Sequence, residues 1–463
     1  MIKLKKIVCH LSAPVYQSIE DALVKNKADN FLFLLRAYRN SDIKDNEIIQ
    51  QLDISMNSLY VLKSRLNDKI QEHLSGDIWT NQEDMLKQLH QVPEVLFGAS
   101  HEVAEAFLLK LEKDLLLHDM HNELLVVYSA LKKLNLHSEK YFHYSQLYNR
   151  HVAFSLSIEK CEDILGSFNR ALAQYNFSRL PKQLDTLLFL NKEISDHFSL
   201  NPSQQTELIK HIIELQLAIF CDRQSDDADM EQILHHTQKL ISDLPAASVH
   251  KSWQPVSDCL FFEYFCKTAQ WKQAAAYYER ANAHLHTLLL FSPVCMTSHF
   301  LMSKLKFLQH QNTEPEPADD VLYDAQDRHS QVLLGIYQAM VCCSKKEYKE
   351  GVRHLNDILN TGSFKDFFHI NTEIKLSLAY MYIQLRDYDM ADSILKNIAR
   401  KIKSEETDYT NILTLIKVFT TDIKQSNRIT QKQKDDFTIF LARNAGSREV
   451  LSFLLPELKT RYT

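Results

Sequence analysis

Apolar residues recur every three or four positions along most of this chain, which is the spacing of one face of an α-helix. The pattern is clearest late in the sequence, where Tyr388, Ala391, Leu395 and Ile398 follow one another at intervals of three, four and three residues. Short polar stretches separate these periodic segments. The pattern predicts an all-α fold in which helices are joined by short turns.

The same arrangement of aromatic, small and large apolar residues occurs two more times before Tyr388. Small residues at a helix crossing let two antiparallel helices approach to about 8–10 Å, and larger side chains fill the space around the contact. We therefore expect these positions to be buried where two helices of a hairpin pack. They are Trp271, Ala274, Tyr278, Ala281, Tyr348, Gly351, Leu355, Leu378, Ala379, Tyr382, Tyr388, Ala391 and Leu395.

These residues resemble the tetratricopeptide repeat, most closely over 373–399 and less closely over 331–359 and the Trp271 segment. The separations depart from that family, because Tyr348 and Tyr388 are 40 residues apart and the family repeats at about 34. The resemblance implies a right-handed solenoid of helical hairpins whose concave face binds peptides or protein segments.

The amino-terminal segment 47–60 resembles a helix-turn-helix motif, with apolar Ile48, Leu52, Ile54 and Leu59 at the expected offsets. Ser55 is suited to cap the second helix, since its hydroxyl can accept a hydrogen bond from a free backbone N–H. If this hairpin reads DNA, its exposed contact set is Asn57, Ser58, Tyr60, Val61, Lys63, Ser64 and Arg65.

Two positions of this hairpin differ from the helix-turn-helix pattern. Ile49 stands where the family prefers Ala, and Asp53 where it prefers Gly. Over 32–75 the six Lys and Arg residues balance six Asp and Glu residues, whereas DNA affinity depends on an excess of positive contacts. DNA binding, protein interaction or dimerisation, and a simple packing cap all remain open for this hairpin.

The chain is predicted to comprise four regions. They are a small helical domain over 1–80, degenerate helical hairpins over 81–250, tetratricopeptide-like repeats over 251–410 with an acidic, Pro-containing loop at 311–320, and capping helices over 411–463. Within these regions we expect one helix to end at Leu74, with Gly76 just beyond it, and a separate pair of helices over 141–154 and 157–175.

Composition narrows the possible functions. Only 7 of 463 residues are Gly, which argues against α/β folds with Gly-rich phosphate loops. The formal net charge of -6 is unusual for a protein whose main task is to grip nucleic acid. The 8 Cys residues form no CxxC pair, so we interpret them as reduced, mostly buried thiols.

No arrangement of residues indicates catalysis, and the chain contains no GxSxG or HExxH motif. Histidines cluster at 118–121, 235–236 and 284–286. His118 and His121 could ligate zinc from one helix face, but no Cys or carboxylate partner is evident nearby. We interpret these residues as surface or turn histidines and predict no metal and no cofactor.

The sequence thus predicts a cytoplasmic, non-enzymatic scaffold or adaptor that binds a protein or peptide partner and no membrane. The longest apolar runs are far too short to cross a bilayer. The alternative is a transcriptional regulator in which the amino-terminal hairpin contacts DNA and the repeats sense a partner.

Overall fold

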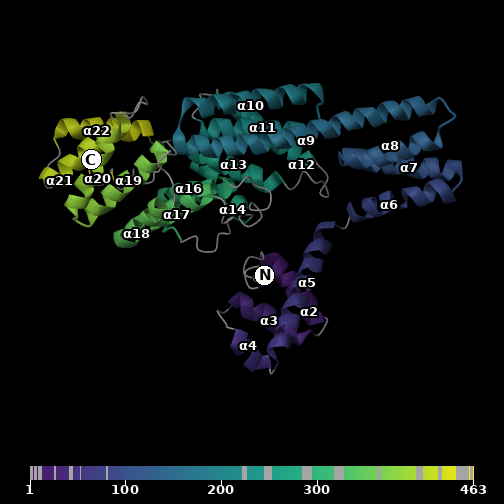
Figure 1. Ribbon diagram of the computed structural model, residues 1–463, viewed down its shortest axis with the longest axis horizontal. Coiled ribbons are helices and arrows are strands. Elements are labelled where there is room, and N and C mark those ends of the chain that lie inside the picture. Colours follow the sequence, from purple (N-terminus) through teal and green to yellow (C-terminus); the bar gives the residue numbers. More distant parts are fainter. Residues whose placement is uncertain are drawn as a thin grey trace. The chain divides into compact units, whose positions relative to one another are not determined.

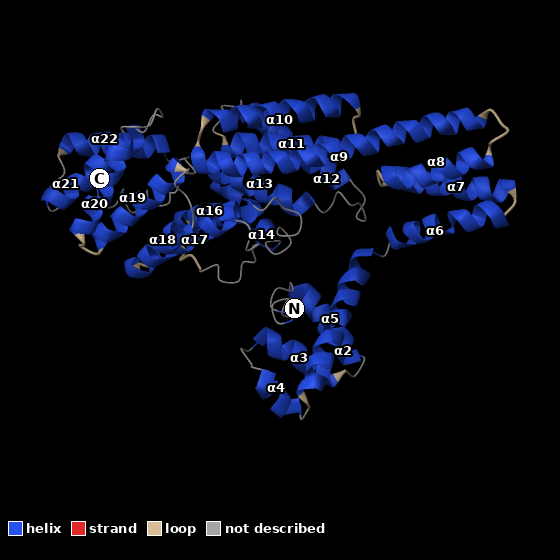
Figure 2. Cartoon of the chain, viewed as in Figure 1, coloured by secondary structure: helices blue, strands red, loops and turns tan. Residues whose placement is uncertain are grey.

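The fold is all-α (Figures 1 and 2). The computed structural model describes residues 4, 8, 13–25, 28–40, 45–52, 54–79, 82–221, 227–243, 253–283, 295–316, 328–361, 367–402, 410–425, 430–444, 458 and 462. Within these segments every regular element is a helix and no strand occurs. None of the described helices is both long and apolar enough to cross a membrane.

The chain divides into two compact units, and the division falls between Val152 and Ala153. The first unit contains α2 (Ala13–Lys25), α3 (Asp29–Asn40), α4 (Asp45–Leu52), α5 (Met56–Trp79), α6 (Gln82–Gly98), α7 (His101–Leu117), α8 (His121–Leu134) and the start of α9 (Lys140–Ser178).

Two separate apolar clusters stabilise the first unit. One joins α2 to α5 around Leu34, Leu35 and Leu66, all fully buried. The other joins α6, α7, α8 and the start of α9 around Leu111 and Leu131. The apolar side of each helix packs into one of these clusters. The amino-terminal helices and the α6–α8 group therefore each have a core of their own.

The second unit contains the rest of α9 and all later helices, and helices adjacent in sequence pack together (Figure 1). These are α10 (Pro181–Leu200), α11 (Gln204–Phe220), α12 (Asp227–Asp243), α13 (Gln254–Lys267), α14 (Trp271–Ala283), α16 (Cys295–His310), α17 (Arg328–Ser344), α18 (Tyr348–Thr361), α19 (Phe368–Gln384), α20 (Tyr388–Ile402), α21 (Thr410–Gln425) and α22 (Gln431–Asn444). The most extensive pairings are α13 with α14, α17 with α18 and α19 with α20.

Five of the described turns that follow helices share one backbone motif. After α19, Arg386 adopts a left-handed φ of 63°, and the N–H of Asp387 donates to the carbonyl of Tyr382 at 2.9 Å. The turns after α7, α13, α16 and α17 repeat both features. This is the Schellman ending of a helix, which usually places Gly at the left-handed position. Here residues with side chains occupy it, in keeping with the low Gly content.

Most of the expected repeat-packing positions lie inside these hairpins. The buried ones are Ala274, Ala281, Gly351, Leu355, Leu378, Ala379, Ala391 and Leu395, and the half-buried ones are Trp271, Tyr278, Tyr348 and Tyr382. Tyr388 differs, because its side chain is 40% exposed. It is the first residue of α20, where the helix emerges from the turn.

Gly351 allows the close helix approach that its position predicts. A Cβ added there would lie 3.3 Å from the backbone oxygen of Ala339 in α17 and 2.9 Å from the sulfur of Met381 in α19. Both contacts are tighter than ordinary van der Waals packing. Gly351 therefore brings α18 against its hairpin partner and against the next hairpin.

Two helix boundaries differ from those expected. The two helices expected over 141–154 and 157–175 are one continuous helix, α9, because Ser155 and Ser157 do not break a helix. Helix α5 continues to Trp79 and does not end near Gly76, since a Gly inside a helix costs only about 1 kcal/mol. Of the acidic loop expected at 311–320, residues 311–316 lie outside helices, and 317–320 are outside the described residues.

Candidate functional site

The α4–α5 hairpin presents the predicted DNA- or partner-contact set on the outer side of α5. Leu59 and Leu66 point into the core of the amino-terminal helices. Ser55 caps α5 as predicted, because its Oγ accepts a hydrogen bond from the N–H of Ser58 at 3.2 Å. The side chains exposed on the other side of α5 are Asn57, Ser58, Tyr60, Val61, Ser64 and Arg65.

Lys63 differs from the rest of that set because it is half-buried. Its ammonium lies 5.8 Å from the centre of the Tyr38 ring in α3, a distance at which a cation is attracted to the face of an aromatic ring. Arg65 is therefore the exposed cation of the set. The exposed face of α5 is mostly polar and also carries Tyr60 and Val61, so it can serve either a nucleic-acid or a protein contact.

Helix α7 carries large apolar residues on the side that faces away from its core. Leu108, Leu111 and Leu115 are buried against the neighbouring helices. Leu109 and Leu116, two helical turns apart, are 41% and 48% exposed. Val103 and Leu117 on α7 and Val126 on α8 are also exposed. Exposed apolar residues gathered on one helix are typical of surfaces that bind other proteins.

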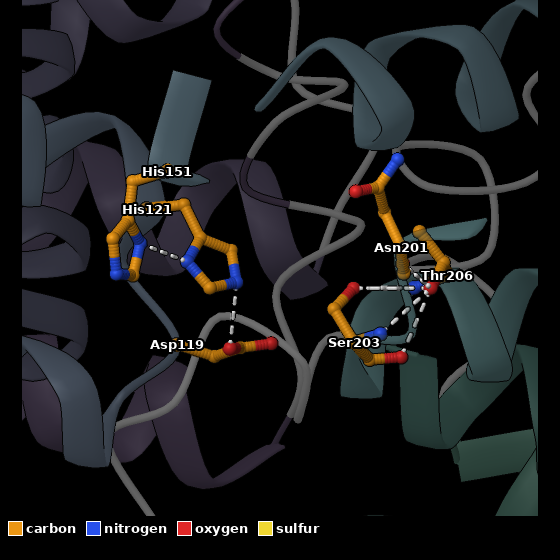
Figure 3. Close-up of polar contacts among 6 residues, drawn as sticks. All are labelled: Asp119, His121, His151, Asn201, Ser203 and Thr206. Atoms are coloured by element: carbon orange, nitrogen blue, oxygen red, sulfur yellow. Dashed lines mark hydrogen bonds and ion pairs between the residues drawn. The ribbon is translucent and has the colours of Figure 1, made fainter. Parts of the chain in front are cut away.

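A buried histidine pair lies where α8 meets α9 (Figure 3). The Nδ1 atoms of His121 and His151 are 2.9 Å apart, and Nε2 of His121 lies 2.8 Å from a carboxylate oxygen of Asp119. Burial, with the nearby His121, lowers the pKa of His151 from 6.5 to about 4. The ring of Tyr128 also packs on His151. The expectation that the histidines at 118–121 lie at the surface or in turns is therefore wrong for His121, which is buried. The expectation that no carboxylate partner lies nearby is also wrong, because Asp119 contacts His121.

A second cluster brings together Glu207 and His211 of α11 and His236 of α12. Their ligand atoms all lie within 4.8 Å of one another, and Nε2 of His236 is 2.9 Å from Oε1 of Glu207. The rings of His211 and His236 meet edge to face with centres 5.3 Å apart. Two imidazoles and one carboxylate at this spacing are a ligand set that transition metals use in proteins.

A capping box fixes the start of α11, one turn before this cluster (Figure 3). Oγ of Ser203 accepts a hydrogen bond from the N–H of Thr206 at 3.2 Å, and the N–H of Ser203 donates to Oγ1 of Thr206 at 3.0 Å. This reciprocal pair satisfies donors that a helix start leaves free. It holds the first turn of α11, which carries Glu207.

His211 is the buried member of the cluster. Its Nδ1 lies 3.2 Å from Oγ1 of Thr237, whose side chain is also buried. Burial, with the neighbouring Lys210, lowers the pKa of His211 to about 4, so the ring is neutral near pH 7. His236 and Glu207 are more exposed and lie on the open side. His211 and His236 are among the residues that line an open groove there.

Sequence reasoning named the 235–236 pair but missed this cluster. The sequence holds one signal for it, the four-residue spacing of Glu207 and His211, which places both on one helix face. His236 is 25 residues further on, and it meets them only because α12 packs on α11. The 284–286 cluster lies outside the described residues.

None of the six cysteine side chains that the structure describes is in a disulfide bond. Cys161, Cys221, Cys259, Cys266 and Cys343 are buried, and Cys342 is half-buried. Burial raises the pKa of the Cys161 thiol to about 11, which disfavours the reactive thiolate. These thiols therefore act as small apolar groups in the core.

Comparisons of this chain with protein-family models, with curated proteins and with solved structures found no match.

Proposed function

We propose that this chain is a non-enzymatic interaction protein that binds a protein segment on its helical hairpins. The observation that carries the proposal is the outward apolar row on α7, in which Leu109 and Leu116 are exposed two turns apart. The resemblance of α13–α14, α17–α18 and α19–α20 to tetratricopeptide hairpins supports the same function, since such arrays bind protein segments in the family they resemble.

The chemistry of the row favours an amphipathic helix as the bound segment. A helix that presents apolar residues at intervals of three or four can pack them against Leu109 and Leu116. The affinity would come mainly from the few apolar anchors.

The test is capture by the full-length chain, followed by cross-linking and mass spectrometry to locate the contact. We expect a discrete partner that cross-links to α7. The double variant Leu109→Ser/Leu116→Ser should no longer capture this partner, since both changes remove apolar contact and leave the buried side of α7 intact. The matched control is Lys110→Ser/Lys113→Ser on the same helix, which should retain most of the binding. Equal capture by the leucine variant would contradict the proposal.

A second candidate is a transcriptional regulator, which the exposed polar face of the α4–α5 hairpin favours. In this case Asn57, Ser58 and Arg65 would contact duplex DNA. The full-length chain should then bind duplex DNA at low salt, with an affinity that falls steeply as salt rises. Arg65→Ala should weaken binding to all sequences if Arg65 contacts phosphate. An absence of binding at 50 mM salt would rule this function out.

We also propose a cytoplasmic location. The six cysteine side chains that the structure describes form no disulfide bonds and are mostly buried, as is usual for thiols in a reducing compartment. Thiol alkylation of the denatured protein, purified from its native cells without reductant, should modify every cysteine. Cysteines protected by disulfide bonds would contradict this location.

A further inference from the structure

The Glu207, His211 and His236 side chains are close enough to share one ion. All three ligand atoms lie within 4.8 Å of one another, and one pair is already at 2.9 Å. Atoms bound to one Zn²⁺ at about 2.0–2.2 Å lie roughly 3–3.5 Å from each other. We expect small rotations about the side-chain bonds of Glu207 and His236 to bring the three atoms to these separations.

The surroundings of His211 hold its ring as metal sites commonly do. A metal-bound histidine uses one ring nitrogen for the ion and hydrogen-bonds through the other to a neighbouring group. Nδ1 of His211 makes such a contact with the buried hydroxyl of Thr237, at 3.2 Å. This contact leaves Nε2 for an ion and fixes the orientation of the ring. His211 is thus a rigid ligand beside two more adaptable ones.

The charges of the groove favour a cation. Glu214 and Glu231 line it together with His211 and His236, and Glu207 adds a third carboxylate. Among the described residues that line the groove, Lys210 is the one with a permanently cationic side chain, and its ammonium is paired with Glu214 at 3.2 Å. The charges of these described side chains therefore sum to a negative value, and Glu214 offsets part of the positive charge of Lys210.

We propose that Glu207, His211 and His236 form a binding site for a transition-metal ion, with Zn²⁺ as the expected occupant. Imidazole ligands exclude Mg²⁺ and Ca²⁺, which bind oxygen atoms. Three protein ligands leave a fourth position of a tetrahedral ion open, and this position faces the groove. The ion would also join α11 to α12. This site is independent of the α7 surface and of the α4–α5 hairpin.

The test is a titration of the full-length, tag-free chain with Zn²⁺ after treatment with a chelator. Competition with a chromophoric chelator should reveal one high-affinity ion per chain. The midpoint temperature of thermal denaturation should rise with Zn²⁺, because the folded state binds the ion. His236→Ala and Glu207→Gln should each weaken this first binding at least tenfold and abolish the thermal shift. Both residues are partly exposed, so the fold tolerates these changes, and circular dichroism verifies it.

The matched control is His235→Ala. His235 is exposed, adjacent to His236 in sequence and lines the same groove, but it is outside the cluster. This variant should bind Zn²⁺ within about twofold of the wild type, whereas Thr237→Val should weaken binding about tenfold by releasing the ring of His211. Weak binding of several ions with no single strong site, or an equal loss in His235→Ala, would overturn the proposal.

Discussion

The turn residues between paired helices show how single side chains constrain this fold. Asp119, Ala269, Asn312, Lys346 and Arg386 each hold a left-handed φ between 54° and 63°. A residue with a Cβ atom is about 1–2 kcal/mol less favourable there than in the right-handed region. Asp and Asn tolerate this conformation better than other residues, but Ala269 has no such compensation.

We predict that Ala269→Gly stabilises the second unit by about 0.5–1 kcal/mol, because relief of the left-handed strain exceeds the added flexibility of the unfolded chain. The measurement is the urea midpoint of unfolding. The control is Ala276→Gly in the next helix, an exposed helical position, which should destabilise by about 1 kcal/mol. A loss of stability in both variants would contradict the assignment of strain to Ala269.

His151 makes the stability of the first unit depend on pH. Its pKa is lowered to about 4 in the folded chain, and the unfolded chain has a pKa near 6.5. Below pH 6.5 the unfolded state therefore binds the proton more readily, and stability is lost as the pH falls toward 4. Above pH 6.5 the residue has no such effect. The titratable and charged groups around this ring are Asp119 of the preceding turn, His121 and Tyr128 of α8, and Arg150 of α9.

The wild-type chain loses stability between pH 7 and pH 4, and we predict that His151→Gln makes this loss smaller by at most about 3 kcal/mol. This bound follows from the shift of roughly two and a half pH units. Urea unfolding followed by circular dichroism at several pH values measures it. His143→Gln, an exposed residue on the same helix, is the control and should keep the wild-type slope. An unchanged slope for His151→Gln would show that other groups carry the pH dependence.

At the scale of the element, two glycines inside helices have opposite effects on stability. The atoms that surround each glycine decide the direction of the effect. Gly351 lies where an added Cβ meets Ala339 and Met381, whereas Gly166 of α9 has no such neighbour within 4 Å. We predict that Gly351→Val destabilises the chain by about 1–3 kcal/mol through overpacking. Gly166→Ala should stabilise it by about 1 kcal/mol through helix propensity. Equal effects of both changes on the urea midpoint would refute the close approach at Gly351.

The sequence predicts local elements well because their causes are local. The apolar spacing and the small residues at Gly351, Ala379 and Ala391 predict the paired helices α17 to α20, and Ser55 correctly marks the start of α5. The continuity of α9 was missed, since two serines are compatible with both a turn and a helix.

The candidate metal cluster was missed for a different reason. It depends on which faces of α11 and α12 meet, and this packing is a tertiary property that no short segment of sequence carries. The exposed face of α5 was easier to predict, because the periodic leucines of one helix also define its opposite side.

At the scale of the whole molecule, the division between Val152 and Ala153 separates two units with their own apolar clusters. Units that do not share a core can unfold in separate steps. The three tryptophans provide a selective probe, because Trp253 and Trp271 pack against a core of the second unit and Trp79 belongs to the first. In a Trp79→Phe variant, tryptophan fluorescence reports on the second unit alone, and circular dichroism reports on all helices.

We predict that the two signals of the Trp79→Phe variant give different urea transitions. Adding Leu111→Ala, which truncates a fully buried side chain of the first unit, should cost about 2–5 kcal/mol there. It should shift the circular dichroism curve toward lower urea and leave the fluorescence midpoint in place. Leu378→Ala, a buried position of the second unit, is the reciprocal control and should shift the fluorescence midpoint. The prediction is contradicted if the two signals coincide and Leu111→Ala moves both midpoints equally. The chain then unfolds in one cooperative step, in which the continuous helix α9 couples the unfolding of the two cores.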